Sequence, residues 1–190
     1  MGRGLGCALH NKVTDMAITY TAQLTGYTRQ CGRQSGGVSR IGIAQVTDID
    51  KITVQDGMIS AITMKSGSFF KDYQSALDQA EYKFADTEAS ILIRLNRVGK
   101  ESSNAYNALK NLAPCGLVAI AQLNNGETVL LGYTEEFGFT RPIVDVTSDS
   151  SSGKALTDEN YFDVTLKTSQ VLAPLFLSDS VSIDTLFKTA

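Results

Sequence analysis

A chain of 190 residues with 43% hydrophobic content is long enough to form one domain with a substantial core. The formal net charge of -3 and a pI near 5.2 argue against a protein that grips nucleic acid through a basic surface. No stretch approaches the roughly 20 apolar residues that span a bilayer, and the first residues lack the apolar centre of a signal peptide. We therefore expect a single soluble domain over residues 1–190, without a membrane-spanning segment and made in a cytoplasm.

The stretch GRQSGGVSRIGI, residues 32–43, has the glycine spacing of a phosphate-binding P-loop. Val38 stands where the P-loop lysine belongs, and residues 40–46 alternate and are rich in β-branched side chains. This pattern favours a strand over the helix whose N-terminus would hold a phosphate. We expect Gly36 and Gly37 to form a turn that leads into a strand, and no nucleotide site.

Two β-hairpins are predicted: one from apolar alternation over residues 52–64 around an Asp-Gly turn, and one from the runs 117–123 and 127–133 that flank residues 124–126. The Asn-Asn-Gly sequence of the second turn offers the positive dihedral angles that a tight reversal needs. Further strands of ordinary length are expected over residues 88–96 and 161–167. The chain is therefore predicted to be mainly β.

One helix is expected between these strands. Ser102 or Ser103 can cap its start, apolar residues then recur at helical spacing, and Pro114 and Gly116 end it. Residues 70–82 fit either a helix or an extended arm. The expected helix has one apolar side, so we expect it to lie against a sheet.

Residues 147–160 are rich in serine, aspartate and glycine, and we expect them to form an exposed connection. Their acidic residues do not have the spacing of an EF-hand calcium loop. We expect arms that order on assembly over residues 1–20 and 175–190, and the second of these has enough apolar surface to clamp a neighbouring subunit. The candidate contacts between subunits are Phe69, Phe70, Leu175, Phe176, Leu186 and Phe187.

The residues that usually bind zinc or act as nucleophiles are few. His10 is the single histidine, and Cys7, Cys31 and Cys115 are far apart and form no CxxC pair. A zinc site of ordinary ligand spacing cannot be drawn from them, and a cysteine nucleophile would need a histidine partner. Because the cysteines are odd in number in a chain without an export signal, we expect reduced thiols.

Close carboxylate pairs offer the remaining route to catalysis, since glycoside hydrolysis uses two carboxylates. Acidic surface strands produce such pairs as well, and no nucleophile, base and orienting group occur together. We therefore expect no enzyme activity and no catalytic, cofactor or metal site. The pairs are Asp86 and Glu88, Glu135 and Glu136, and Asp158 and Glu159.

A series of short motifs runs through most of the chain: Cys31, Gly36–Val38, Arg40–Ala44, Asp56–Ile59 with Ile62 and Met64, Phe69-Phe70, Tyr73, Ala80–Tyr82, Leu117–Ile120, Asn124–Gly126, Leu130–Tyr133, Ser152–Leu156, Asp158 and Tyr161–Leu166. Their order resembles the tail tube or ring proteins of phages that infect Bacteroidetes. The glycine-rich start and the hydrophobic tail depart from that pattern. A tube protein, a neck ring and a tail completion or terminator protein therefore stay open.

The resemblance implies a mainly β fold with one flanking α-helix, arranged as a β-sandwich or β-barrel of the tail-tube type with extended arms. It further implies that subunits self-associate through their sheets into rings, contact neighbouring virion proteins and enclose a channel. DNA would be non-specific cargo in that channel, and the protein would be located in the virion. Elementary physics agrees, because a ring subunit needs exposed strand edges, and a mildly acidic channel lets DNA slide.

Two other classes of protein compete with this interpretation. A carbohydrate- or protein-binding β-sandwich module of a phage fibre would have a similar composition, and we expect it to show an exposed aromatic cluster. A hydrolase would depend on one of the carboxylate pairs. A ring subunit is distinguished from both by long self-complementary strand edges.

Overall fold

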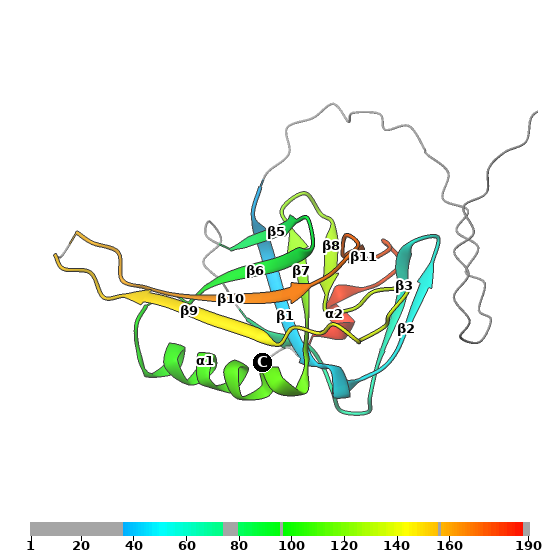
Figure 1. Ribbon diagram of the computed structural model, residues 1–190, viewed down its shortest axis with the longest axis horizontal. Coiled ribbons are helices and arrows are strands. Elements are labelled where there is room, and N and C mark those ends of the chain that lie inside the picture. Colours follow the sequence, from blue (N-terminus) through cyan, green and yellow to red (C-terminus); the bar gives the residue numbers. More distant parts are fainter. Residues whose placement is uncertain (1–35, 74–79, 96, 156, 188–190) are drawn as a thin grey trace, which may run out of the picture. The chain divides into compact units, whose positions relative to one another are not determined.

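The computed structural model describes residues 36–73, 80–95, 97–155 and 157–187. They form two larger antiparallel sheets, a separate two-stranded hairpin and one main helix (Figure 1). The predicted mainly β fold with a flanking helix is confirmed, as a sandwich-like arrangement of sheets. Neither of the larger sheets closes into a barrel within the described ranges. The arm expected over residues 1–20 lies outside these ranges.

The first sheet has five strands in the order β11-β8-β7-β1-β4. Its centre is the pairing of β1 with β7, which runs from Val38 opposite Leu123 to Gln45 opposite Leu117. The strand predicted after the Gly36-Gly37 turn is therefore confirmed, and no helix follows that turn. The bounds are β1 Val38–Gln45, β4 Lys71–Asp72, β7 Leu117–Leu123, β8 Thr128–Leu131 and β11 Leu175–Phe176.

The second sheet has four strands in the order β5-β6-β10-β9. Pairing runs through these described strands without a register shift. The expectation of a connection over residues 147–160 is wrong for residues 147–151, which belong to β9 and pair with β10, although most of them are exposed as expected. The bounds are β5 Glu81–Ala85, β6 Glu88–Leu95, β9 Asp145–Ser151 and β10 Tyr161–Ser169.

Both predicted hairpins are confirmed. The first joins β2 (Ile49–Gln55) to β3 (Met58–Met64), and its turn residues Asp56 and Gly57 have φ angles of 53° and 74°. Positive φ at both central residues is the backbone of a type I′ turn, for which Asp-Gly is a preferred sequence. The second joins β7 to β8 through Gly126, whose φ is 93°.

The main helix, α1, covers Lys100–Leu112 and begins one turn earlier than Ser102 or Ser103 would place it. Gly99 occupies the cap position, and the Ser102 hydroxyl instead donates to the Arg97 carbonyl oxygen at 2.6 Å. The predicted end is confirmed. A short 3₁₀ turn over Ala113–Cys115 follows the helix, and Gly116 leaves it with a φ of 86°, which suits glycine.

Two apolar clusters hold the sheets together. The first lies between the larger sheets and under α1, where the Tyr106 and Phe162 rings pack with centroids 5.9 Å apart. The second lies on the other face of the five-stranded sheet, under the β2–β3 hairpin and the C-terminal segment. That segment contains the short helix α2 (Ile183–Leu186) and ends its described part at Phe187. The five-stranded sheet is therefore covered on both faces.

Candidate assembly surface

The face of the four-stranded sheet that points away from the core is polar. Strand residues alternate between faces, and the unshifted register places every second residue of the four strands on one surface. We call this surface the outer face. It comprises Glu81, Lys83 and Ala85 of β5, Glu88, Ser90, Leu92 and Arg94 of β6, Tyr161, Asp163, Thr165, Lys167 and Ser169 of β10, and Asp145, Thr147, Asp149 and Ser151 of β9.

Arg94 is the centre of a charged network on the outer face. Its Nε and Nη2 atoms donate to the two carboxylate oxygens of Asp163, at 2.6 and 2.7 Å, and its Nη1 atom donates to Glu159 at 3.0 Å. Its guanidinium carbon lies 4.5 Å from the centroid of the Tyr161 ring. The hydrogen bonds to Asp163 and, to a smaller extent, the one to Glu159 raise the pKa of Arg94 above its ordinary range.

Tyr161 continues the network towards β9. Its hydroxyl donates to Asp149 Oδ2 at 3.1 Å, and this hydrogen bond raises the pKa of Tyr161 above 10.0. The network therefore joins β6, β10 and β9 across one surface. Asp163 has only 12% of its side chain exposed, so the bidentate pair with Arg94 is needed to compensate the loss of its hydration.

Acidic groups outnumber basic groups on the outer face. The carboxylates of Glu81, Glu88, Asp145, Asp149 and Asp163 share it with the cations of Lys83, Arg94 and Lys167. Lys167 lies 3.1 Å from Glu88, and Arg94 is paired as described above. The face is mixed in charge, slightly acidic, and has no dense basic belt among the described residues.

The two edges of this sheet are longer than those of the five-stranded sheet, whose outermost strands, β4 and β11, have two residues each. Strand β5 has five residues and β9 has seven, and neither pairs with a further described strand on its outer side. The Val146 carbonyl oxygen at the β9 edge accepts a hydrogen bond from Lys110 Nζ at 2.6 Å. Such edges can add a strand from another chain.

The residues predicted to contact a neighbouring subunit lie on both faces of the five-stranded sheet, since Phe176 packs against the first apolar cluster and most of the others against the second. Phe70, Leu186 and Phe187 are buried in the second apolar cluster, and the Phe70 amide donates to the Leu186 carbonyl oxygen at 2.9 Å. Phe69, Leu175 and Phe176 are half-buried. The C-terminal segment thus packs on its own subunit as far as Phe187, and contact between subunits through these side chains stays a prediction.

The carboxylate pairs found in the sequence have structural surroundings. Asp158 accepts hydrogen bonds from the amides of Lys154 and Ala155, which lower its pKa below 3.8, and Glu159 pairs with Arg94. Asp86 occupies the β5–β6 turn with a φ of 59°. The remaining pair, Glu135 and Glu136, is exposed in the turn closed by Thr134 and Gly138.

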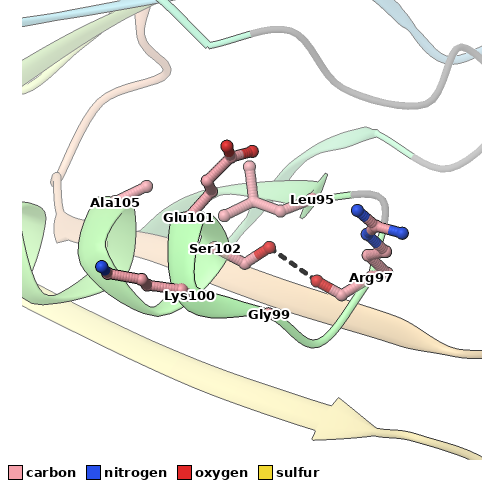
Figure 2. Close-up of a pocket in the computed structure, with 7 residues that line it drawn as sticks. All are labelled: Leu95, Arg97, Gly99, Lys100, Glu101, Ser102 and Ala105. Atoms are coloured by element: carbon pink, nitrogen blue, oxygen red, sulfur yellow. Dashed lines mark hydrogen bonds between the residues drawn. The ribbon is translucent and has the colours of Figure 1, made fainter.

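A pocket of about 680 Å³ lies at the start of α1, at the end of the four-stranded sheet where β6 finishes (Figure 2). Figure 2 shows the hydrogen bond from Ser102 to Arg97 that shapes the loop on one side. We call it the α1 pocket. Its walls combine apolar and charged side chains, and it is lined by Leu95, Arg97, Gly99, Lys100, Glu101, Ser102 and Ala105.

The opposite end of the same sheet has a shallower groove of about 470 Å³, between Glu88, Arg141, Val144 and Lys167. Val144 is 55% exposed there.

In the part of the chain that the structure describes, no three histidine, cysteine or acidic side chains gather as metal ligands would. Cys115 is a free, exposed thiol, while Cys7, Cys31 and His10 lie outside the described ranges.

Sequence reasoning missed the outer face because it missed β9. The alternation of Asp145, Val146 and Thr147 is only a weak signal for that strand, and the serines that follow are typical of a loop.

None of the helices that the structure describes is long and apolar enough to cross a membrane. No protein-family model, curated protein or solved structure matches this chain.

Proposed function

We propose that this chain is a structural subunit that self-associates into rings of a virion, of the phage tail tube or neck type, through which the genome passes. The observation that carries the proposal is the four-stranded sheet with a polar outer face, whose two edge strands pair with no further strand among the described residues. If β5 of one copy pairs with β9 of the next, the sheets of all copies join into one closed surface.

Pairing of the edges would satisfy backbone groups that otherwise face water. It would also extend the apolar inner side of the sheet across the joint, because the half-buried Tyr82 and Phe84 of β5 would gain cover from the neighbouring β9 and α1. Closed cyclic symmetry would then limit the growth of such head-to-tail pairing.

The outer face suits the lining of a channel for DNA. A dense basic lining would hold phosphates by releasing their counterions, whereas a mixed and slightly acidic lining lets the duplex slide. Strand β9 would contribute Asp145 and Asp149 to that lining and no basic residue, and strand β5 would contribute Glu81 together with Lys83. DNA is thus non-specific cargo in this proposal.

The arrangement also suits a tail completion or terminator protein, which would form one ring at the end of a tail. A fibre module that binds carbohydrate or protein is the alternative of a different class. Such a module would be monomeric or trimeric, and its strand edges would not be needed for assembly. The oligomeric state of edge variants therefore distinguishes it from a ring subunit.

A proline on β9 tests the proposal. The Val146 carbonyl oxygen bonds to Lys110, so it points away from β10, and the antiparallel alternation gives Ser148 the same orientation. Ser148→Pro removes an amide from the open edge and leaves the β10 ladder in place. The matched control, Ser148→Ala, keeps the amide.

We expect the full-length protein and Ser148→Ala to form rings, and Ser148→Pro to stay monomeric with an unchanged circular dichroism spectrum. Light scattering coupled to gel filtration measures the oligomeric state. If Ser148→Pro forms the same rings as the control, the β9 edge is not the joint, and the proposed mode of assembly is wrong.

A further inference from the structure

We propose that the two ends of the four-stranded sheet bind one another head to tail, so that loops of one copy enter the α1 pocket of the next. The inference rests on the proposed function and deepens it, because this contact would stack one ring on another. The occupant of the pocket is a second copy of this chain, through loops defined below.

The first step is the position of the two surfaces on the same strand pair. Leu95 of β6 lies opposite Phe162, and at the other end Glu88 lies opposite Ser169, the last residue of β10. At 3.4 Å per residue these ends are about 24 Å apart along the strands. The α1 pocket adjoins Leu95, and the chain that follows Ser169 leaves from the other end. A shift along the strand direction would bring the two surfaces together.

The second step is the apolar surface that follows β10. Val171 and Leu172 are each 56% exposed, and Phe137, in the turn closed by Thr134 and Gly138, is 48% exposed. We call residues 135–137 and 171–173 the end loops. Contiguous exposed apolar side chains of this kind mark interaction surfaces more often than isolated ones do.

A single buried side chain fixes the end loops together. Gln170 is fully buried; its Nε2 atom donates to the Tyr133 carbonyl oxygen at 3.2 Å, and its amide donates to the Thr87 carbonyl oxygen at 2.8 Å. Val171 and Leu172 follow Gln170 directly, and Glu135 is two residues beyond Tyr133. The exposed apolar residues Val171 and Leu172 therefore follow a residue that is buried and fixed by hydrogen bonds.

The third step is charge. Glu135 and Glu136 are exposed in the end loops, and Arg97 and Lys100 are exposed at the α1 pocket. Glu101 also lines the pocket, so its lining contains two basic side chains and one acidic side chain. Leu95 and Ala105 provide an apolar wall for an entering side chain such as Leu172. Opposite charges and apolar contacts are thus arranged on the two surfaces in a complementary way.

Crosslinking tests the contact without depending on ring closure. In a full-length chain whose Cys7, Cys31 and Cys115 are replaced by serine, Leu172→Cys and Ala105→Cys are introduced together and treated with a short bismaleimide. A head-to-tail contact links each copy to two others, so we expect a ladder of covalent oligomers. The control chain carries Leu172→Cys with Met58→Cys, because Met58 is also exposed and lies on β3.

The ladder from the Ala105→Cys chain, and no ladder from the Met58→Cys control, supports the inference. Absence of a ladder from the first chain, or equal ladders from both, overturns it. Charge reversal provides a second readout: Glu135→Lys with Glu136→Lys should abolish the ladder, and adding Arg97→Glu and Lys100→Glu should restore it. Rings without a ladder would refute the stacking contact alone, and a ladder without rings would refute the proposed ring alone.

Discussion

Gly42 of β1 leaves the space that the ring of Phe187 fills. A Cβ atom at position 42 would overlap Phe187 Cε1 and Cζ, and would lie 3.1 Å from Phe70 Cβ. The guanidinium carbon of Arg40 lies over the same ring, 4.0 Å from its centroid. The C-terminal segment therefore packs closely against β1 because Gly42 has no side chain there, and apolar burial adds to this contact.

Gly42→Ala should release or displace that segment. Overpacking a filled core destabilises by about 1 to 3 kcal/mol, and the loss should be largely absent when Phe187→Ala is already present. Chemical denaturation of both single variants and the double variant measures this coupling. Gly36→Ala is the control, since no described atom lies within 4 Å of a Cβ there. Additive effects of Gly42→Ala and Phe187→Ala would contradict the account of this contact.

Asp163→Asn should destabilise the protein by about 2 to 4 kcal/mol, because it weakens a bidentate pair at a carboxylate that is largely out of water. Glu159→Gln removes a partner of the same Arg94 at a side chain that is 67% exposed, and should change stability by about 0.5 kcal/mol or less. Urea unfolding compares the two. Equal losses would mean that Asp163 has no special part in the network.

The Asp158 carboxyl group should titrate below 3.8, since the Lys154 and Ala155 amides donate to its ionised form at 2.7 and 2.9 Å. A folded pKa below the unfolded one gives a stabilising contribution that is complete at neutral pH and is lost as the pH falls through the folded pKa. Carbon-detected NMR titration of Asp158 measures the midpoint, and Asp158→Asn should remove the accompanying shift of the two amides. A midpoint at or above 3.8 would count against these hydrogen bonds.

The cysteines should all be reduced. Cys115 is a free, exposed thiol, so a thiol reagent should react with it in the folded protein. Unfolding under non-reducing conditions should then reveal three free groups, the number of cysteines in the sequence. A count of one would show a disulfide between two of them. Cys115→Ser, which removes the exposed thiol, identifies the signal from the folded state.

The strands of both hairpins could be predicted from sequence. Residues 52–64 alternate, residues 117–123 are an apolar run buried on both faces, and both hairpins have turns with a glycine at positive φ, so local chemistry and fold agree. Strand β9 could not be predicted in this way. Only Val146 of its seven residues is buried, and its strand conformation depends on pairing with β10, a contact that local sequence does not specify.

The first residue of α1 and the surface on which the C-terminal segment packs could not be predicted from local sequence either. Two serines offered good caps, yet the helix begins at Lys100 because the chain turns at Gly99 and Ser102 bonds back to Arg97. The apolar residues of the tail indicated that it docks, but not on which surface. That surface is set by Gly42 and Phe70, which are far from Phe187 in sequence.

Electron microscopy of the purified full-length protein at high concentration, and of the virion in which we propose that it occurs, tests the central claim most directly. We predict closed rings in which β5 of one copy pairs with β9 of the next, and in which the mixed, slightly acidic outer face lines the hole. A protein that stays monomeric in both settings, or a ring whose hole is lined by a continuous belt of arginine and lysine, would contradict the account.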